Sequence, residues 1–145
     1  MAVELLDGGS GQAAVAIDLD GATTVSASVA GDCLFRSFTV DQTCAPITYL
    51  TFCSASGHVD NRSGAKDTTW SMAGYVGKGN TYSQPGSLFA LTSSSTLTFT
   101  YATGCSVVIV PMVTRDQNSL VAYGETARVV EGKARAIPTW TWVTS

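Results

Sequence analysis

His58, the single histidine of this 145-residue chain, is the residue whose surroundings come nearest to catalytic chemistry. Asp60 follows two residues later, and Ser54 and Ser56 lie just before it, which suggests a serine hydrolase. Such an enzyme also needs an oriented nucleophile, and no Gly-x-Ser-x-Gly elbow precedes a helix here. A lone histidine in a glycine-rich loop is ordinarily a surface residue. We therefore expect a protein that is not an enzyme, and keep a hydrolase that uses His58 as an alternative.

Two nearby carboxylates, Asp18 and Asp20, could bind a metal ion or act as an acid and base pair. Asp20 precedes Gly21, and Asp-Gly is the dipeptide that suits the positive φ angles of a type I′ hairpin turn. No Asp-x-Asp-x-Asp-Gly loop with a distal glutamate follows. A hairpin turn explains this pair better than a metal site does, and we expect neither a metal nor a cofactor.

The cysteines have the even count of a disulfide framework, but they have no Cys-x-x-Cys spacing. A zinc site would need all four of them, or three together with His58, at unusual separations. Buried free thiols fit the pattern best, and one or two disulfides remain the alternative. The four residues are Cys33, Cys44, Cys53 and Cys105.

Aromatic side chains could form a sugar-binding face, because flat rings stack on the faces of pyranoses. Trp140 and Trp142 would point the same way in a strand. We favour packing on a sheet face or at a subunit interface, where aromatics are enriched, over a carbohydrate-binding β-sandwich. Basic residues are too few and too scattered to grip nucleic acid. The other candidate aromatics are Trp70, Tyr75, Tyr82 and Tyr123.

The elements that must position these side chains are strands, because no segment sustains the apolar spacing of an amphipathic helix. The clearest strand is 96–101, where Leu97, Phe99 and Tyr101 alternate with threonines. Pro111 cannot donate to a ladder, so its strand should lie at a sheet edge or be bulged. The block 85–91 could form one helical turn. We expect strands at 13–19, 22–29, 33–40, 46–53, 68–76, 96–101, 105–114, 119–130 and 134–143.

Composition indicates one all-β domain over residues 1–145 that meets other protein at its surface. Only 13% of the residues are charged, against about a quarter in an average soluble domain. Residues 1–50 carry six acids and one base, whereas residues 51–145 carry five acids and seven bases, Arg128, Lys133 and Arg135 among them. Opposite ends of neighbouring copies could therefore attract each other, and scattered solvated charges are the alternative. The sequence has no secretory signal and no apolar run long enough for a membrane span, so we expect assembly in a cytoplasm.

The order of these elements resembles the tail tube protein of long-tailed bacteriophages. The resemblance runs from the hairpin near Asp20 through residues 51–54, a polar loop at 54–66, the strand 67–75, the apolar block after Gly86, and the closing segments 123–130 and 136–140. It covers most of the chain as a pattern, and no residue in it is diagnostic alone.

This resemblance implies a β-sandwich, or partly open barrel, with one short helix at 86–91. It also implies a virion structural protein whose subunits form hexameric rings, with strands joined into an inner barrel to which the first strands contribute. The rings would stack into a tube with other tail proteins and pass DNA without sequence-specific binding or contact with a membrane. Another virion protein, for decoration or head-to-tail joining, is an alternative of the same class.

Two sets of site residues follow from the resemblance. The loop 54–66 would be the ring-stacking loop, through Ser54, Gly57, His58, Asp60, Asn61, Arg62, Gly64 and Lys66. Acids that face the lumen or an interface would be Asp18, Asp20 and Asp32.

Overall fold

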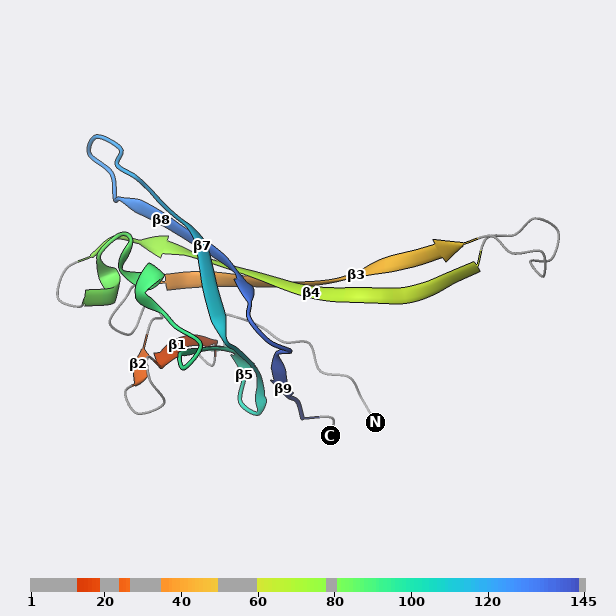
Figure 1. The fold of residues 1–145 in the computed structure, drawn as a ribbon. Coiled ribbons are helices and arrows are strands. Elements are labelled where there is room, and N and C mark those ends of the chain that lie inside the picture. Colours follow the sequence, from red (N-terminus) through yellow and green to blue (C-terminus); the bar gives the residue numbers. More distant parts are fainter. Residues whose placement is uncertain (1–12, 19–23, 27–34, 50–59, 78–80, 144–145) are drawn as a thin grey trace.

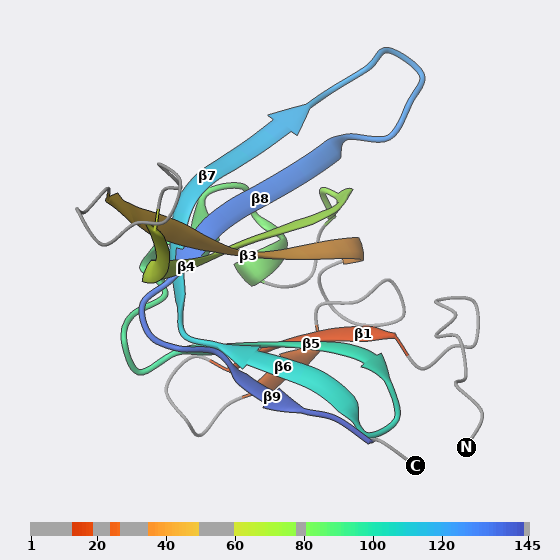
Figure 2. The ribbon, with the colours of Figure 1, turned by 90° about the vertical axis from the view of Figure 1, so that its right-hand side faces the viewer.

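The structure is a computed structural model that describes residues 13–18, 24–26, 35–49, 60–77 and 81–143. Its described strands form two antiparallel sheets that face each other as a sandwich and do not close into a barrel (Figures 1 and 2). The expected all-β sandwich is therefore confirmed. Within the described residues, no helix has the length and apolar character needed to cross a bilayer.

The five-stranded sheet has the order β2-β1-β5-β6-β9, and the four-stranded sheet has the order β3-β4-β8-β7. The first sheet contains β1 (Ala14–Asp18), β2 (Thr24–Ser26), β5 (Thr96–Ala102), β6 (Cys105–Ile109) and β9 (Thr139–Thr141). The second contains β3 (Phe35–Tyr49), β4 (Asp60–Tyr75), β7 (Pro111–Ser119) and β8 (Ala127–Ala134). Two 3-10 helices, η3 (Thr81–Ser83) and η4 (Ser87–Ala90), lie between β4 and β5, and η4 occupies the place where the short helix at 86–91 was expected.

The core forms where the apolar faces of the two sheets meet. In β5 the side chains of Leu97 and Phe99 are fully buried, whereas the alternating threonines are only partly buried. The opposite sheet contributes Trp70 and Met72 from β4, and Leu88 of η4 belongs to the same cluster. The period-2 pattern of the sequence therefore identified the inward faces of these strands correctly.

The main departure from expectation is the length of the second hairpin. Strands expected separately at 33–40 and 46–53 are one continuous strand, β3, and β4 already begins at Asp60. A register shift between Cys44 and Pro46 marks an irregularity in this ladder, and Pro46 is tolerated because β3 is an edge strand. The prediction of a loop over 54–66 is therefore wrong for residues 60–66, and residues 54–59 lie outside the described part.

Two further expected strands are divided differently. The segment 105–114 passes from β6 in one sheet to β7 in the other at Val110, so it is two strands. Pro111 is the first residue of the edge strand β7, as its missing N–H required. Residues 120–126 form a turn instead of the start of a strand at 119–130, and β9 is only three residues long. The early hairpin is confirmed, because Asp18 pairs with Thr24, although Asp20 and Gly21 lie outside the described residues.

Candidate functional site

The long β3–β4 hairpin projects from the sandwich as an arm (Figure 1). We define the β3–β4 arm as residues 41–49 and 60–68, which lie beyond the part of the hairpin that covers the core. Nearly all its described side chains are exposed, on both faces of the ribbon. A two-stranded ribbon without a covered face is only marginally stable in water. Packing against another molecule would therefore stabilise the arm.

Local contacts hold the two strands of the arm together near its far end. The Arg62 guanidinium lies 5.3 Å from the centre of the Tyr49 ring. The Thr48 hydroxyl donates to Asn61 Oδ1 over 3.0 Å. These contacts are local to the ribbon and do not reach the sandwich core.

Gly64 is required by a close approach of the two backbones. A Cβ at this position would lie 2.3 Å from the carbonyl oxygen of Ala45, next to the register shift of β3. Any side chain would therefore push the strands apart at this point. The sequence offered Gly64 as a loop residue, whereas the structure gives it a role in closing the arm.

The stacking residues expected from the sequence fall into two groups. Asn61, Arg62, Gly64 and Lys66 lie together in the arm as part of β4, and Asp60 is its first residue. Ser54, Gly57 and His58 lie outside the described residues. The structure thus brings the second half of the expected set together, in a strand instead of a loop.

Only one of the three expected acids lies within the described residues. Asp18 lies on β1, on the outward face of the five-stranded sheet, where it pairs with Thr96 of β5. Asp20 and Asp32 lie outside the described residues. Their roles at a lumen or interface stay a prediction.

The outward face of the four-stranded sheet is polar. Strand pairing aligns Thr39, Ser71, Glu131 and Arg115 in one row across all four strands. The next row contains Asp41, Thr69, Lys133 and Met112, and Thr43 pairs with Asp67 beyond it. We call these ten residues the polar face.

Each cation of the polar face lies beside a carboxylate of the same face. Lys133 Nζ is 3.0 Å from Asp67 Oδ2, and Arg115 Nη1 is 3.9 Å from Glu131 Oε2. All four side chains are about half exposed, so each pair contributes little to the free energy of unfolding. Their effect is to neutralise the two cations, with Asp41 as a further negative charge.

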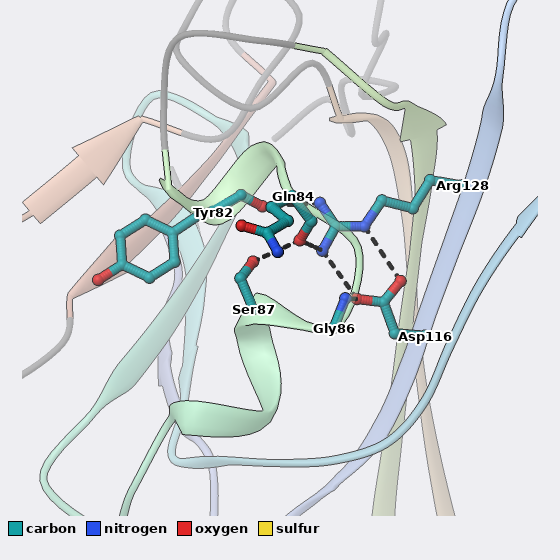
Figure 3. Close-up of polar contacts among 6 residues, drawn as sticks. All are labelled: Tyr82, Gln84, Gly86, Ser87, Asp116 and Arg128. Atoms are coloured by element: carbon teal, nitrogen blue, oxygen red, sulfur yellow. Dashed lines mark hydrogen bonds and ion pairs between the residues drawn. The ribbon is translucent and has the colours of Figure 1, made fainter.

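A buried ion pair joins the β7–β8 hairpin to the segment 82–86 (Figure 3). The guanidinium of Arg128 donates to both carboxylate oxygens of Asp116, over 3.1 and 2.8 Å, and both side chains are fully buried. It also donates to the carbonyl oxygens of Tyr82 and Gln84, over 2.7 and 3.2 Å. The Gly86 N–H donates to Asp116 Oδ2 over 2.7 Å.

Sequence reasoning missed this ion pair, because it treated Arg128 as one member of a basic cluster. A signal was nevertheless present. In the strand 127–134, Arg128 has the same parity as Val130 and therefore points inward. An inward arginine requires a buried acceptor.

Three aromatic side chains form a patch beside the edge strand β9. Tyr101 stacks on Trp140 with ring centres 6.2 Å apart, and Trp142 lies edge-on to both. We call Tyr101, Trp140 and Trp142 the aromatic patch. Partial burial raises the pKa of the Tyr101 phenol, because the phenolate would lose hydration. Among the described residues, no group of three or more histidine, cysteine, aspartate or glutamate side chains could hold a metal ion.

Two of the four cysteines, Cys44 and Cys105, lie within the described residues. Cys44 on the arm is exposed, Cys105 is buried, and both are free thiols. Cys105 therefore agrees with the expectation of a buried thiol, whereas that expectation is wrong for Cys44, because the arm has no covered face. Cys33 and Cys53 lie outside the described residues.

Comparison with solved structures finds this fold in assembled tails. One match is the "tail of empty GTA particle computed with helical refinement, C6 symmetry", with a TM-score of 0.67, 12% identity and coverage of 91% of this chain and 97% of that chain. A chain from the "virion of native gene transfer agent (GTA) particle" matches with a TM-score of 0.65, 13% identity and coverage of 88% and 95%.

A third match comes from an extracellular contractile injection system, in its "PVC sheath-tube complex in extended state". Its TM-score is 0.64 at 13% identity, with coverage of 98% of this chain and 93% of that chain. No protein-family model matches the sequence, and no curated protein matches it. The fold of this chain is that of proteins in phage-like tails and injection machines, as the order of its elements indicated.

Proposed function

We propose that this chain is a virion structural protein, the subunit of a tail tube that conducts DNA. Copies assemble into hexameric rings, and the rings stack into the tube with other tail proteins. The observation that carries the proposal is a fold shared over nearly the whole chain with tail particles, one of them of C6 symmetry. The localisation is the virion, and the protein is not an enzyme.

The four-stranded sheet is suited to form the wall of the tube. Its two edge strands, β3 and β7, have neighbours within the chain on one side only. Exposed edges invite pairing with another chain, and closure into a barrel removes them. Pairing of β3 in one copy with β7 in the next would join the sheets around the ring. The polar face would then line the lumen. This arrangement differs from the expected contribution of the first strands, because β1 and β2 belong to the other sheet.

The charges of the polar face fit the passage of DNA. A free lysine or arginine would bind phosphate and slow the passage. Here Asp67 and Glu131 neutralise the two cations, and the remaining groups are mainly hydroxyls and Asp41. The wall would therefore not bind the phosphates of the passing DNA and would not recognise its base sequence.

The β3–β4 arm is suited to contact the next ring. It extends away from the sandwich, and almost all of its described surface is exposed. The expected stacking residues Asn61, Arg62 and Lys66 lie on it. Packing against a neighbouring ring would give the ribbon the covered face that it needs for stability.

Negative-stain electron microscopy of the purified protein tests the proposal. We expect rings and tubes at high protein concentration, with sixfold symmetry in end views. Sedimentation across a range of salt concentrations should show large species in equilibrium with the subunit. A stable monomer under all these conditions would contradict the proposed function.

A further inference from the structure

The turn between β7 and β8 exposes large apolar side chains. Leu120, Val121 and Tyr123 are 79%, 63% and 111% exposed, and we call them the apolar tip. A monomer rarely presents such a cluster without a partner. The turn lies at the far end of the β7–β8 hairpin, and β9 lies at the opposite end of the molecule (Figure 2).

The β7–β8 hairpin that carries the apolar tip has regular strand pairing and a defined turn. Strands β7 and β8 pair as far as Ser119 and Ala127, and the Gly124 N–H donates to the Val121 carbonyl over 3.0 Å. Tyr123 has a φ of 61°, in the left-handed region that a bulky residue seldom adopts. Backbone strain of this kind concentrates at functional sites.

The aromatic patch at the other end is an uncovered extension of the core face. Strand pairing aligns Phe99, Val107 and Trp140 across β5, β6 and β9, and the first two are fully buried. Trp140 and Trp142 are nevertheless 39% and 48% exposed. The Tyr101 ring also packs edge-on against Phe38 of β3, at 4.9 Å, which connects the patch to the core.

We infer that the apolar tip of one copy docks on the aromatic patch of a neighbouring copy. This inference rests on the proposed function, which places many copies side by side. The apolar tip and the aromatic patch occur on one chain at opposite ends, so the contact is heterologous and propagates from copy to copy. Charge does not oppose the contact, since Glu125 is the charged residue of segment 119–126 and segment 134–143 carries no acid that would repel it.

Tryptophan fluorescence offers a direct readout of this contact. The chain has three tryptophans, and Trp70 is already buried at 2% exposure. Quenching by acrylamide therefore reports mainly on Trp140 and Trp142. We expect assembly of the wild-type protein to reduce quenching several-fold.

Variants at the two ends separate the contact from the rest of the assembly. Tyr123→Ser and Trp142→Ser should each raise the concentration needed for assembly at least tenfold. Phe89→Ser is the matched control, because Phe89 is a 54% exposed aromatic residue on η4, and it should leave that concentration within twofold. Circular dichroism checks that all three variants fold, as their exposed positions imply.

Mixing the two variants tests the partner. A tip variant still carries an intact patch, and a patch variant still carries an intact tip. Below the concentration at which either assembles, the mixture should form heterodimers in analytical ultracentrifugation, whereas each variant alone stays monomeric. Absence of heterodimers would overturn the inference.

The remaining outcomes are also decisive. Wild-type tubes whose tryptophans stay as quenchable as in the monomer would overturn the docking contact but leave the proposed function intact. Glycan-array binding that is lost in Trp140→Ala would assign the patch to carbohydrate and overturn the docking. A wild-type protein that never assembles would remove the proposed function itself.

Discussion

Arg128 carries a charge at a position where the sandwich otherwise buries apolar side chains. Its guanidinium is matched by the Asp116 carboxylate, two backbone carbonyls and the face of the Phe35 ring at 5.2 Å. Such a pair does not itself add much to the free energy of unfolding, because both charges lose hydration. Loss of one member is costly, because it leaves the other charge buried and unpaired.

Replacement of Arg128 by methionine should therefore lower the free energy of unfolding by about 3–5 kcal/mol, measured by urea denaturation. Arg115→Met is the matched control, since Arg115 lies in an exposed pair and its loss should cost less than about 1 kcal/mol. The double variant Asp116→Leu with Arg128→Met should recover much of the loss. If Arg128→Met and Arg115→Met lower the free energy of unfolding equally, burial does not determine the cost of losing the arginine.

Tyr101 gives the free energy of unfolding a dependence on alkaline pH. Its pKa is raised in the folded state by burial, above the usual value of 10.0. The unfolded chain therefore loses this proton first, so stability is full below pH 10 and falls as the pH rises through the folded pKa. Tyr101→Phe should reduce the slope of this fall, measured by urea denaturation between pH 9 and 11. Equal slopes for Tyr101→Phe and the wild type would contradict this dependence.

At the scale of elements, the β3–β4 arm depends on one glycine. Gly64→Val would place a branched side chain where even a Cβ lies 2.3 Å from the Ala45 carbonyl oxygen. Because the arm lies outside the core, we expect the thermal unfolding midpoint of the monomer to change by only a few degrees. The concentration needed for tube assembly should rise at least tenfold, about 1.4 kcal/mol per contact.

Ala90→Val is the control, since it adds a branched side chain at an exposed position of η4, outside the arm. Its tubes should form as those of the wild type do, as judged by electron microscopy and sedimentation. If Gly64→Val assembles as readily as Ala90→Val, the arm does not contribute to stacking.

The sequence predicted those elements whose side chains alternate and whose ends carry turn residues. The strand 96–101 and the early hairpin are examples, because one face of each must be buried. It did not predict the arm, since polar residues at 41–45 and 60–66 read as a loop when no core covers them. A strand exposed on both faces has no alternation to detect.

The candidate site divides in the same way. Asn61, Arg62, Gly64 and Lys66 were expected as contact residues in a loop. They lie in the strand β4, and their role as contact residues stays a prediction. The Asp116–Arg128 pair was missed, because its partners are brought together by long-range packing. Sequence spacing alone contains no information on which acceptor meets a given inward arginine.

At the scale of the whole molecule, the balance of charges on the polar face should control how DNA interacts with the tube. Glu131→Gln would leave Arg115 without its carboxylate and expose a cation on the lumen wall. We expect assembled tubes of this variant to retain fluorescent DNA several-fold more strongly at low salt, with the difference lost at high salt.

Glu125→Gln removes the same charge from the turn between β7 and β8, away from the polar face, and is the matched control. DNA retention by its tubes should equal that of the wild type. Retention that rises equally in both variants would show a response to net charge, and would argue against a lumen lined by the polar face.

The β3–β4 arm also has a genetic consequence. The nine β3 residues of the arm, 41–49, at roughly 3.3 Å per residue extend about 30 Å from the sandwich, so in the proposed tube the arm of one copy would reach its neighbours. A defective arm would then disrupt the contacts of the neighbouring copy as well as those of its own copy. Coexpression of an arm-defective copy with the wild type should disrupt the assembly of mixed tubes, so such alleles would be dominant negative.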